Sequence, residues 1–359
     1  MKSMKESGYV DGYTDENTGD IGIEIYGRDA VLLNAPEVRL SPDTPLLTKA
    51  QDVAGAINEL FQLDPGGGDD WTPPEDWLPV PEPGDYEIYL LVDIVDVSSA
   101  SSTLAFVLTR PVDAGTGYDS LTIDWGDGTI QSWLGIENGG TSWSQSDTIH
   151  TYTAIGQYIV KIVASAGSCF LQRIIPNGNQ ASVVLIAKLG REIVVNNDSI
   201  SGGTDHTQRA FYNQCRLHYV KLGGKGGLPR GLGFYNCTTL RKVEIAIPPT
   251  IIPDRTFLYC YNLKKFDFSE VTEIADRGLQ YSYFPKLDLP KCTSIGTDGV
   301  MCCPITKEVT APLCASVGNN GFIDDFGIEK AIFSENCIFG TDCFQSCFSL
   351  IPRPDGSIN

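Results

Sequence analysis

Three residues in the second quarter of the chain carry side chains suited to acid–base chemistry. Asp124 and Asp127 lie in the stretch "DWGDGT", and His150 follows in "HTYTAIGQYIVKI". Two carboxylates and an imidazole can transfer protons or bind a cation such as calcium. Turn formation already accounts for both Asp residues, because an Asp-Gly pair favours a tight hairpin turn. No nucleophile motif accompanies them, so we interpret the group as structural, with catalysis and a calcium site as the alternatives.

Cysteine is the second residue type with possible chemistry, and the chain has eleven Cys. Eight of them recur at fixed positions of a sequence repeat: Cys215, Cys237, Cys260, Cys303 and Cys347 in one row, and Cys292, Cys314 and Cys337 in another. Cysteine is a small residue that is readily buried, and no CxxC pair has the matching partner pair that a zinc site needs. The pattern therefore favours columns of buried, reduced thiols over disulfides or zinc. We predict no metal and no cofactor.

Basic and aromatic residues form a third group. From residue 207 to residue 290 there are twelve Lys and Arg against seven Asp and Glu, a local charge of +5 in a chain of net charge −19. Tyrosines are frequent in the same stretch, and a Tyr ring covers contact area at a small entropic cost. The predicted ligand-binding residues are Arg241, Lys242, Lys264, Lys265, Tyr261 and Tyr283. The alternatives are ion pairs between repeats, which contribute little at a surface, and tyrosines that shield the corners of the repeat structure.

Charge and hydropathy exclude several classes of protein. A net charge of −19 argues against nucleic-acid binding and against anionic membrane surfaces. No run approaches the roughly 18 apolar residues of a membrane-spanning helix, and the N-terminal sequence lacks the apolar segment of a signal peptide. The sequence also lacks the GxSxG, HExxH and P-loop motifs. We therefore predict a non-enzymatic protein that is made in the cytoplasm and does not insert into a membrane.

A repeat organises the C-terminal half of the chain. Each unit opens with an apolar residue, continues with Cys or another small residue and then Leu, and ends in an alternating apolar segment. The opening residues are Phe211, Phe234, Phe257, Leu279, Val300, Phe322 and Phe344, with spacings of 23, 23, 22, 21, 22 and 22 residues. A fixed period of this length is typical of a solenoid, in which each unit buries its apolar side against its neighbours.

The wording of the repeat resembles a known family. The unit "GFYNCTTLRKVEI" is similar to the leucine-rich repeats of the BspA-like type, and the similarity extends over about 140 residues. The later units "LQYSYFPKLDL", "VMCCPITKEVTAP" and "FIDDFGIEKAIF" depart from the pattern, with Ser282 and Asp325 in place of Cys. The resemblance implies a recognition role for the solenoid.

The chain divides into four predicted segments. Residues 1–63 contain short strands and a helix over 48–62, residues 64–84 are a Gly/Pro linker, residues 85–166 are rich in strands, and residues 167–359 form the solenoid. "TKAQDVAGAINELF" resembles a segment of phage fibre and baseplate proteins, and "DWGDGT" followed by "HTYTAIGQYIVKI" resembles the PKD domain, an immunoglobulin-like β-sandwich. The predicted fold class is thus mainly β.

These resemblances imply a function. We predict a bacteriophage virion structural protein, a fibre of the tail, baseplate or capsid, in which residues 1–63 bind other virion proteins and the solenoid binds a glycan or protein of the host surface. Such fibres are often homo-oligomers, and a trimer is the first expectation. The alternative is a bacterial cell-surface adhesin of the BspA-like type.

Overall fold

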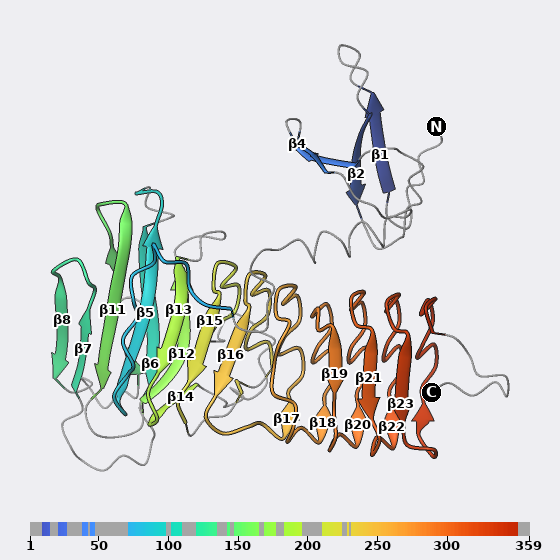
Figure 1. The fold of residues 1–359 in the computed structure, drawn as a ribbon. Coiled ribbons are helices and arrows are strands. Elements are labelled where there is room, and N and C mark those ends of the chain that lie inside the picture. Colours follow the sequence, from blue (N-terminus) through green and yellow to red (C-terminus); the bar gives the residue numbers. More distant parts are fainter. Residues whose placement is uncertain are drawn as a thin grey trace. The chain divides into compact units, whose positions relative to one another are not determined.

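The computed structural model is almost entirely β in the residues that it describes (Figure 1). These are residues 9–14, 21–26, 38–41, 44–46, 71–97, 102–109, 120–134, 142–143, 147–164, 169–176, 183–195, 210–224, 228–229 and 231–350. Within these ranges the chain contains no α-helix, and therefore no helix long and apolar enough to cross a membrane. The predicted helix over 48–62 lies outside the described residues. The chain forms two compact units, Met1–Trp71 and Thr72–Asn359.

The first unit contains two antiparallel strand pairs. Strand β1 (Tyr9–Thr14) pairs with β2 (Ile21–Tyr26), and β3 (Val38–Ser41) pairs with β4 (Thr44–Leu46). The short strands expected in residues 1–63 are present.

The second unit begins with two sheets that share one core. Their strands are β5 (Glu87–Ile94), β6 (Thr103–Thr109), β7 (Ser120–Asp124), β8 (Ile130–Leu134), β9 (Ser142–Trp143), β10 (His150–Thr151), β11 (Gly156–Ala164), β12 (Cys169–Pro176), β13 (Val184–Leu189) and β14 (Ile193–Val195). One sheet has the order β10-β6-β12-β14, with β9 also paired to β6. Phe106 on this sheet stacks on Trp125 after β7, with ring centroids 5.5 Å apart. Both rings are fully buried, so the two sheets pack face to face. We refer to this part as the sandwich.

The other sheet joins the sandwich to the solenoid. Its seven strands run in the order β16-β15-β13-β5-β11-β7-β8, where β15 (Tyr219–Leu222) and β16 (Lys242–Ile245) are the first solenoid strands. Strand β13 pairs antiparallel with β5 and parallel with β15. Strands β12 to β14 fall in the segment that the sequence analysis assigned to the solenoid. Strand β12 pairs with β6, β13 pairs with β5, and β14 pairs with β12. Hydrogen bonding is therefore continuous from the sandwich into the first coils, as the row of strands in Figure 1 shows.

The part of the predicted linker that the structure describes lies on this seven-stranded sheet. Trp77 and Val80 pack against Leu91 and Ile186. Trp77 also contacts the ring of His218 edge-on, with centroids 5.1 Å apart. Trp77 thus fixes the described part of the linker against the sheet.

Each solenoid coil adds one strand on either side of a thin core. On one side lie β19 (Lys286–Asp288), β21 (Glu308–Ala311) and β23 (Lys330–Phe333), and on the other lie β17 (Ile251–Ile252), β18 (Glu273–Ile274), β20 (Ser294–Ile295), β22 (Ser316–Val317) and β24 (Ile338–Phe339). All neighbouring strands within these two sheets are parallel. The opening residues of the repeat stack through the core: Phe211 on Phe234 at 5.0 Å, and Phe234 on Phe257 at 5.5 Å. The predicted solenoid is confirmed.

The turn after each β17-side strand has an unusual backbone. Six successive coils contain two non-glycine residues with positive φ, four positions apart, for example Leu232 (φ 52°) and Asn236 (φ 57°). Between such residues, alternate N–H groups point toward the next coil: Phe234 N–H donates to Thr256 O, and Asn236 N–H donates to Leu258 O, both at 2.9 Å. We call this edge of the solenoid the turn corner. Its backbone groups are satisfied alternately from coil to coil and within a coil, where Tyr235 N–H donates to Leu232 O at 3.1 Å.

Buried thiols support the same coil-to-coil pattern. The side chain three residues after each opening residue donates to the carbonyl of the opening residue in the preceding coil. The pairs are Cys237–Phe211 (3.0 Å), Cys260–Phe234 (3.1 Å), Ser282–Phe257 (2.6 Å), Cys303–Leu279 (3.2 Å) and Cys347–Phe322 (3.0 Å). All eight repeat cysteines are free thiols, which confirms the sequence prediction, although Cys215 and Cys337 are only half-buried.

Asp325 occupies this thiol column in one coil and behaves differently. Its side chain is fully buried, and Oδ1 accepts a hydrogen bond from the N–H of Cys303. Oδ2 is buried and has no hydrogen-bond partner in the part of the chain that the structure describes. Burial raises the pKa of Asp325 well above its usual value. The neutral acid is therefore the form that this site favours.

Candidate functional site

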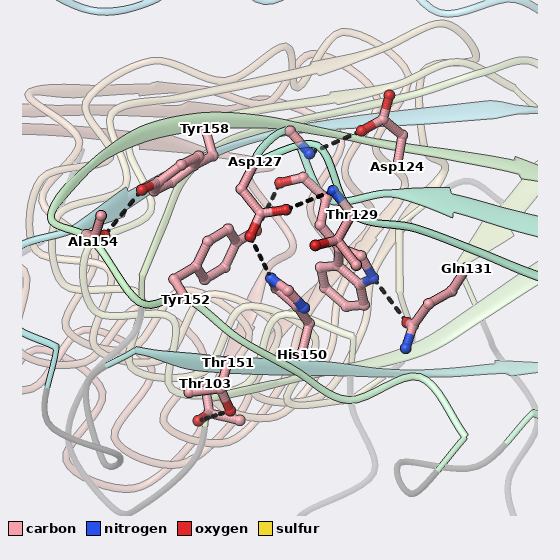
Figure 2. Close-up of polar contacts among 12 residues, drawn as sticks. Thr103, Asp124, Asp127, Thr129, Gln131, His150, Thr151, Tyr152, Ala154 and Tyr158 are labelled. Carbon is pink, nitrogen blue, oxygen red and sulfur yellow. Dashed lines mark hydrogen bonds and ion pairs between the residues drawn. The ribbon is translucent and has the colours of Figure 1, made fainter.

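The acid–base group predicted from the sequence assembles at one end of the sandwich core (Figure 2). Asp124 Oδ1 accepts a hydrogen bond from Gly126 N–H at 2.9 Å, and Asp127 Oδ1 accepts one from Thr129 N–H at 2.9 Å. The second oxygen of Asp127 lies 2.8 Å from Nε2 of His150. Both carboxylates thus close turns onto their own backbone, as the Asp-Gly sequence predicts.

The imidazole of His150 is held by packing as well as by this hydrogen bond. It stacks on Trp125 with ring centroids 4.8 Å apart and meets Tyr152 edge-on at 4.7 Å. Trp125 Nε1 donates to Gln131 Oε1 at 2.8 Å, and the hydroxyl of Tyr152 donates to the carbonyl of Trp125 at 3.1 Å. Figure 2 shows these side chains converging from separate strands and loops. Each polar group has a partner inside the sandwich.

Electrostatics at Asp127 agree with a structural role. Burial alone would raise the pKa of Asp127, but the hydrogen bonds from Thr129 and His150 outweigh burial and lower this pKa. Among the described residues, no Ser or Cys side chain hydrogen-bonds to His150, so the group lacks the nucleophile of a catalytic triad. The described part of the chain also contains no group of three or more His, Cys, Asp or Glu that could hold a metal ion.

A groove of about 620 Å³ runs along the side of the solenoid that carries strands β18 to β24. Ala275, Gly296, Gly318 and Gly340 lie in its lining, between the strands β18 to β24. Coil packing explains these small residues: a Cβ on Gly318 would lie 2.6 Å from the backbone nitrogen of Thr297 in the preceding coil. The glycine column is therefore required for close stacking, whatever the groove binds.

The predicted ligand-binding residues lie on three consecutive coils, after the turn corner of each. Arg241 and Lys242 lie at the start of β16, and Lys265 forms an isolated parallel bridge with Lys242 from the next coil. The rings of Tyr261 and Tyr283 are 5.4 Å apart. Tyr261 precedes Lys264 by three residues, so their Cα atoms are within about 11 Å. We call the four cations the basic row: Arg241, Lys242, Lys264 and Lys265.

Ion pairing occurs in part of this region. Lys242 pairs with Glu244 of its own strand at 2.7 Å, and Glu308 bridges Lys286 and Lys330 of the flanking coils at 3.5 and 2.7 Å. The ion pairs between coils that the sequence analysis considered are therefore real. Within the basic row, the ion pair between Lys242 and Glu244 joins two residues of the same strand, β16.

Two further tyrosines complete the cluster. Tyr259 lies 6.0 Å from Tyr261 and 4.9 Å from Tyr281, measured between ring centroids, and Tyr261 lies 6.4 Å from Tyr281. We call the set the tyrosine platform: Tyr259, Tyr261, Tyr281 and Tyr283. All four are half-buried, whereas the adjacent Phe284 is in the core with 1% exposure. Burial raises the pKa of Tyr261 to about 12 and also raises the pKa of Tyr283, so these hydroxyls stay neutral hydrogen-bond donors.

Tyr259 and Tyr281 have left-handed backbone conformations, with φ of 66° and 58°. Other coils place Asn213, Asn236 or Asp324 at the equivalent position. Asn and Asp tolerate this conformation, whereas for a bulky residue it is a genuine outlier that costs roughly 1–2 kcal/mol. The sequence analysis did not select these two residues for the site. Alignment of the units would have found them, since Tyr stands there where the first two units have Asn.

Comparison with known proteins identifies the repeats. Residues 232–351 match, in six copies, the family described as BspA type leucine rich repeat region. No curated protein matches the chain. Among solved structures, the chain is similar to a leucine-rich repeat protein of T. pallidum (TpLRR) at 14% identity, over 51% of this chain and 83% of that one, with a TM-score of 0.30. Over residues 232–351, the solenoid coils are thus similar to BspA-type leucine-rich repeats.

Proposed function

We propose that this chain is a non-enzymatic recognition protein whose solenoid binds a ligand on a cell surface. The supporting observation is the gathering of the basic row and the tyrosine platform on consecutive coils. Tyr and Arg are enriched in binding interfaces because they combine contact area with polar groups. Repeat proteins present such residues in register, since equivalent positions stack from coil to coil.

Within this role, we propose that the protein is a structural component of a phage virion. The support is the resemblance of "TKAQDVAGAINELF", residues 48–61, to phage fibre and baseplate proteins. Residues 1–63 then bind other virion proteins, and the chain forms a homo-oligomer, with a trimer as the first expectation. Several weak solenoid contacts on one particle give strong attachment through multivalency. A bacterial adhesin of the BspA-like type is the second candidate, favoured by the repeat family itself.

Charge removal tests the binding role. The basic row is replaced by Ser at all four positions in the full chain, and attachment to host cells is measured against salt concentration. Attachment should weaken and its salt dependence should flatten, because fewer counterions are exchanged on binding. The fold should persist, since surface substitutions usually change stability by less than about 0.5 kcal/mol each.

A matched control removes four positive charges elsewhere on the second unit. The residues are Lys161, Arg191, Lys291 and Lys330, each of which forms an ion pair at the surface. This variant should attach like the unmodified chain. If the basic-row variant also attaches normally, while changes in the sandwich loop near Trp143 abolish attachment, the binding site lies on the sandwich and the proposal is wrong.

The location of the protein distinguishes the virion role from the adhesin role. An antibody against the second unit should label phage particles if the chain is a virion protein, and the bacterial envelope if it is an adhesin. Replacing Ile57 and Leu60 with Asp removes two apolar side chains from the helix predicted over residues 48–62. Incorporation into particles should then be lost, whereas attachment of the isolated protein to cells should be retained. Labelling of the cell envelope alone would reject the virion role.

A further inference from the structure

We propose that the tyrosine platform binds the sugar rings of an acidic polysaccharide, while the basic row binds its anionic groups. This inference rests on the proposed function, for which it names the ligand class. Three features of the platform support it: the φ angles of Tyr259 and Tyr281, the orientation of the rings, and the polar side chains beside them.

The backbone shows that the platform is placed against local preference. Tyr259 and Tyr281 adopt φ of 66° and 58° at a position that is held by Asn213, Asn236 and Asp324 in three other coils and by the small residues Cys302 and Ser346 in two more. Strained residues of this kind persist where the fold over-determines them, and they cluster at functional sites. A residue that lowers stability without filling the core is expected to be kept for binding.

The platform combines tilted rings with partial exposure to solvent. The opening phenylalanines stack nearly parallel, with interplanar angles of 4° for Phe211–Phe234 and 3° for Phe322–Phe344, whereas other core rings are tilted, for example by 64° for Phe257–Phe266. All of these phenylalanine rings pack in the solenoid core rather than on its surface. Platform rings meet at 31° to 75°, and the angle is 55° between Tyr261 and Tyr283. Tilted, half-buried rings turn part of their faces outward, and the C–H face of a sugar packs on such surfaces.

The polar chemistry of the site also suits a sugar. The phenolic hydroxyl of Tyr261 both donates and accepts hydrogen bonds, so it can exchange them with sugar hydroxyls. Lys264 and Lys265 follow Tyr261 closely in the same coil, so their ammonium groups can reach carboxylate or phosphate groups of a chain that lies across the rings.

A protein ligand fits this surface less well. A stable protein interface needs about 800 Å² on each partner and an apolar centre. The large hydrophobic side chains that are exposed in the described residues lie elsewhere, for example Ile130, Ile338 and Phe348. The platform spans two coils and offers tyrosine alone. A narrow polymer that carries negative charge matches both its size and its composition.

Binding measurements on the full chain test this inference. The probes are a polyuronate, the same polymer with its carboxyl groups reduced, a phosphate-bearing polysaccharide, and polyglutamate. At least one acidic polysaccharide should bind 10-fold or more tightly than both the reduced polymer and polyglutamate, and the comparison of polyuronate with the phosphate-bearing polymer tells which anion is preferred. Equal affinity for polyglutamate and both acidic polysaccharides would overturn the inference, since charge alone would then suffice.

A double variant separates binding from structure. Tyr259→Asn with Tyr281→Asn installs the residue that other coils use, so the melting temperature should stay the same or rise while polysaccharide affinity falls at least 10-fold. Asp324→Asn is the matched control at the same backbone position outside the platform, and it should retain full affinity. A double variant that keeps its affinity, or that loses it only because it melts at a lower temperature, contradicts the inference. If cells are bound through the basic row but no polysaccharide is bound, the proposed function stands and this inference alone fails.

Discussion

The sandwich and the solenoid use chemically active side chains in opposite ways. In the sandwich, the residues that most resemble a catalytic group, Asp127 and His150, each meet a structural requirement: one closes a turn and the other packs on Trp125. In the solenoid, Tyr259 and Tyr281 occupy backbone positions that favour other residues. The difference teaches that a reactive side chain is weak evidence of function when local structure explains it. A residue that local structure opposes is stronger evidence.

The two regions also differ in how contacts are distributed. The sandwich core joins Phe106, Trp125 and His150 from strands and loops far apart in sequence. Contacts in the solenoid join equivalent positions of adjacent coils. Stability in such an array is approximately a sum of coil and nearest-neighbour contributions. Damage to the sandwich should therefore spread, and damage to a distal coil should stay local.

The largest effect is expected from Trp125→Ala in the sandwich. Trp125 is fully buried between Phe106 and His150, and truncation of a buried Trp costs about 3–5 kcal/mol. Chemical denaturation followed by circular dichroism measures the loss. Ile130→Ala is the control, because Ile130 is 64% exposed and should change stability by less than about 0.5 kcal/mol. Equal effects of the two variants would contradict the assignment of the core.

Phe322→Ala tests whether damage stays local in the solenoid. Phe322 is fully buried and stacks on Phe344 at 5.3 Å, so the local cost should again be about 3–5 kcal/mol. Hydrogen exchange should accelerate in the coils around Phe322 and remain slow in β5 and β11. Uniform acceleration of exchange through both regions would show that the second unit unfolds as one body. The expected difference between the sandwich and the solenoid would then be wrong.

Asp325→Cys should stabilise the solenoid at neutral pH. The folded-state pKa of Asp325 is raised above its unfolded value, so folding retains a proton that the unfolded chain releases. Stability is thus fully present below the unfolded pKa and falls as pH rises toward the folded pKa, by at most about 1.4 kcal/mol per pH unit. We expect the neutral carboxyl to donate to the carbonyl of Val300, as the thiols do in other coils.

The measurement is a series of denaturation curves from pH 4 to pH 8. The Cys variant should lose the part of the slope that comes from Asp325, and Asp324→Asn, which alters the half-buried neighbouring carboxyl, should keep it. An unchanged slope in the Cys variant would mean that Asp325 is ionised in the folded protein.

The smallest effect is expected from His150→Ala. The change removes one hydrogen bond to Asp127, which keeps its second hydrogen bond from Thr129, and also removes the ring that stacks on Trp125. The cost should be about 1–3 kcal/mol, below that of Trp125→Ala. Binding to cells should be unaffected. If this variant folds normally but loses attachment, the polar group of the sandwich has a functional role that its structural contacts do not reveal.

The repeat made much of the solenoid predictable. The spacing of Phe211, Phe234 and Phe257 predicts one coil per unit, and these rings do stack in the core. The free thiols followed from the same alignment. The left-handed residues did not, because residues as different as Asn236, Tyr259 and Arg255 adopt positive φ there, and their conformation is imposed by coil stacking rather than by local preference.

Long-range pairing could not be predicted from the sequence. Strand β13 pairs antiparallel with β5 and parallel with β15, and neither partner is marked by periodicity or turn residues. The burial of Asp325 was equally hidden: the alignment shows an Asp in the thiol column, but only the packing of adjacent coils shows that its second oxygen has no partner among the described residues. The immunoglobulin-like classification of the sandwich and the roles of residues 1–63 remain predictions.

Oxidative footprinting of the full chain bound to its host surface tests the central claim most directly. Hydroxyl radicals modify exposed Tyr rings, so the bound protein should show reduced modification of the tyrosine platform relative to the free protein. Tyr89 and Tyr158, which are half-buried in the sandwich, serve as internal references and should change less. Protection confined to the sandwich, or to residues of the groove beside β18 to β24, with an unchanged platform, would contradict the account.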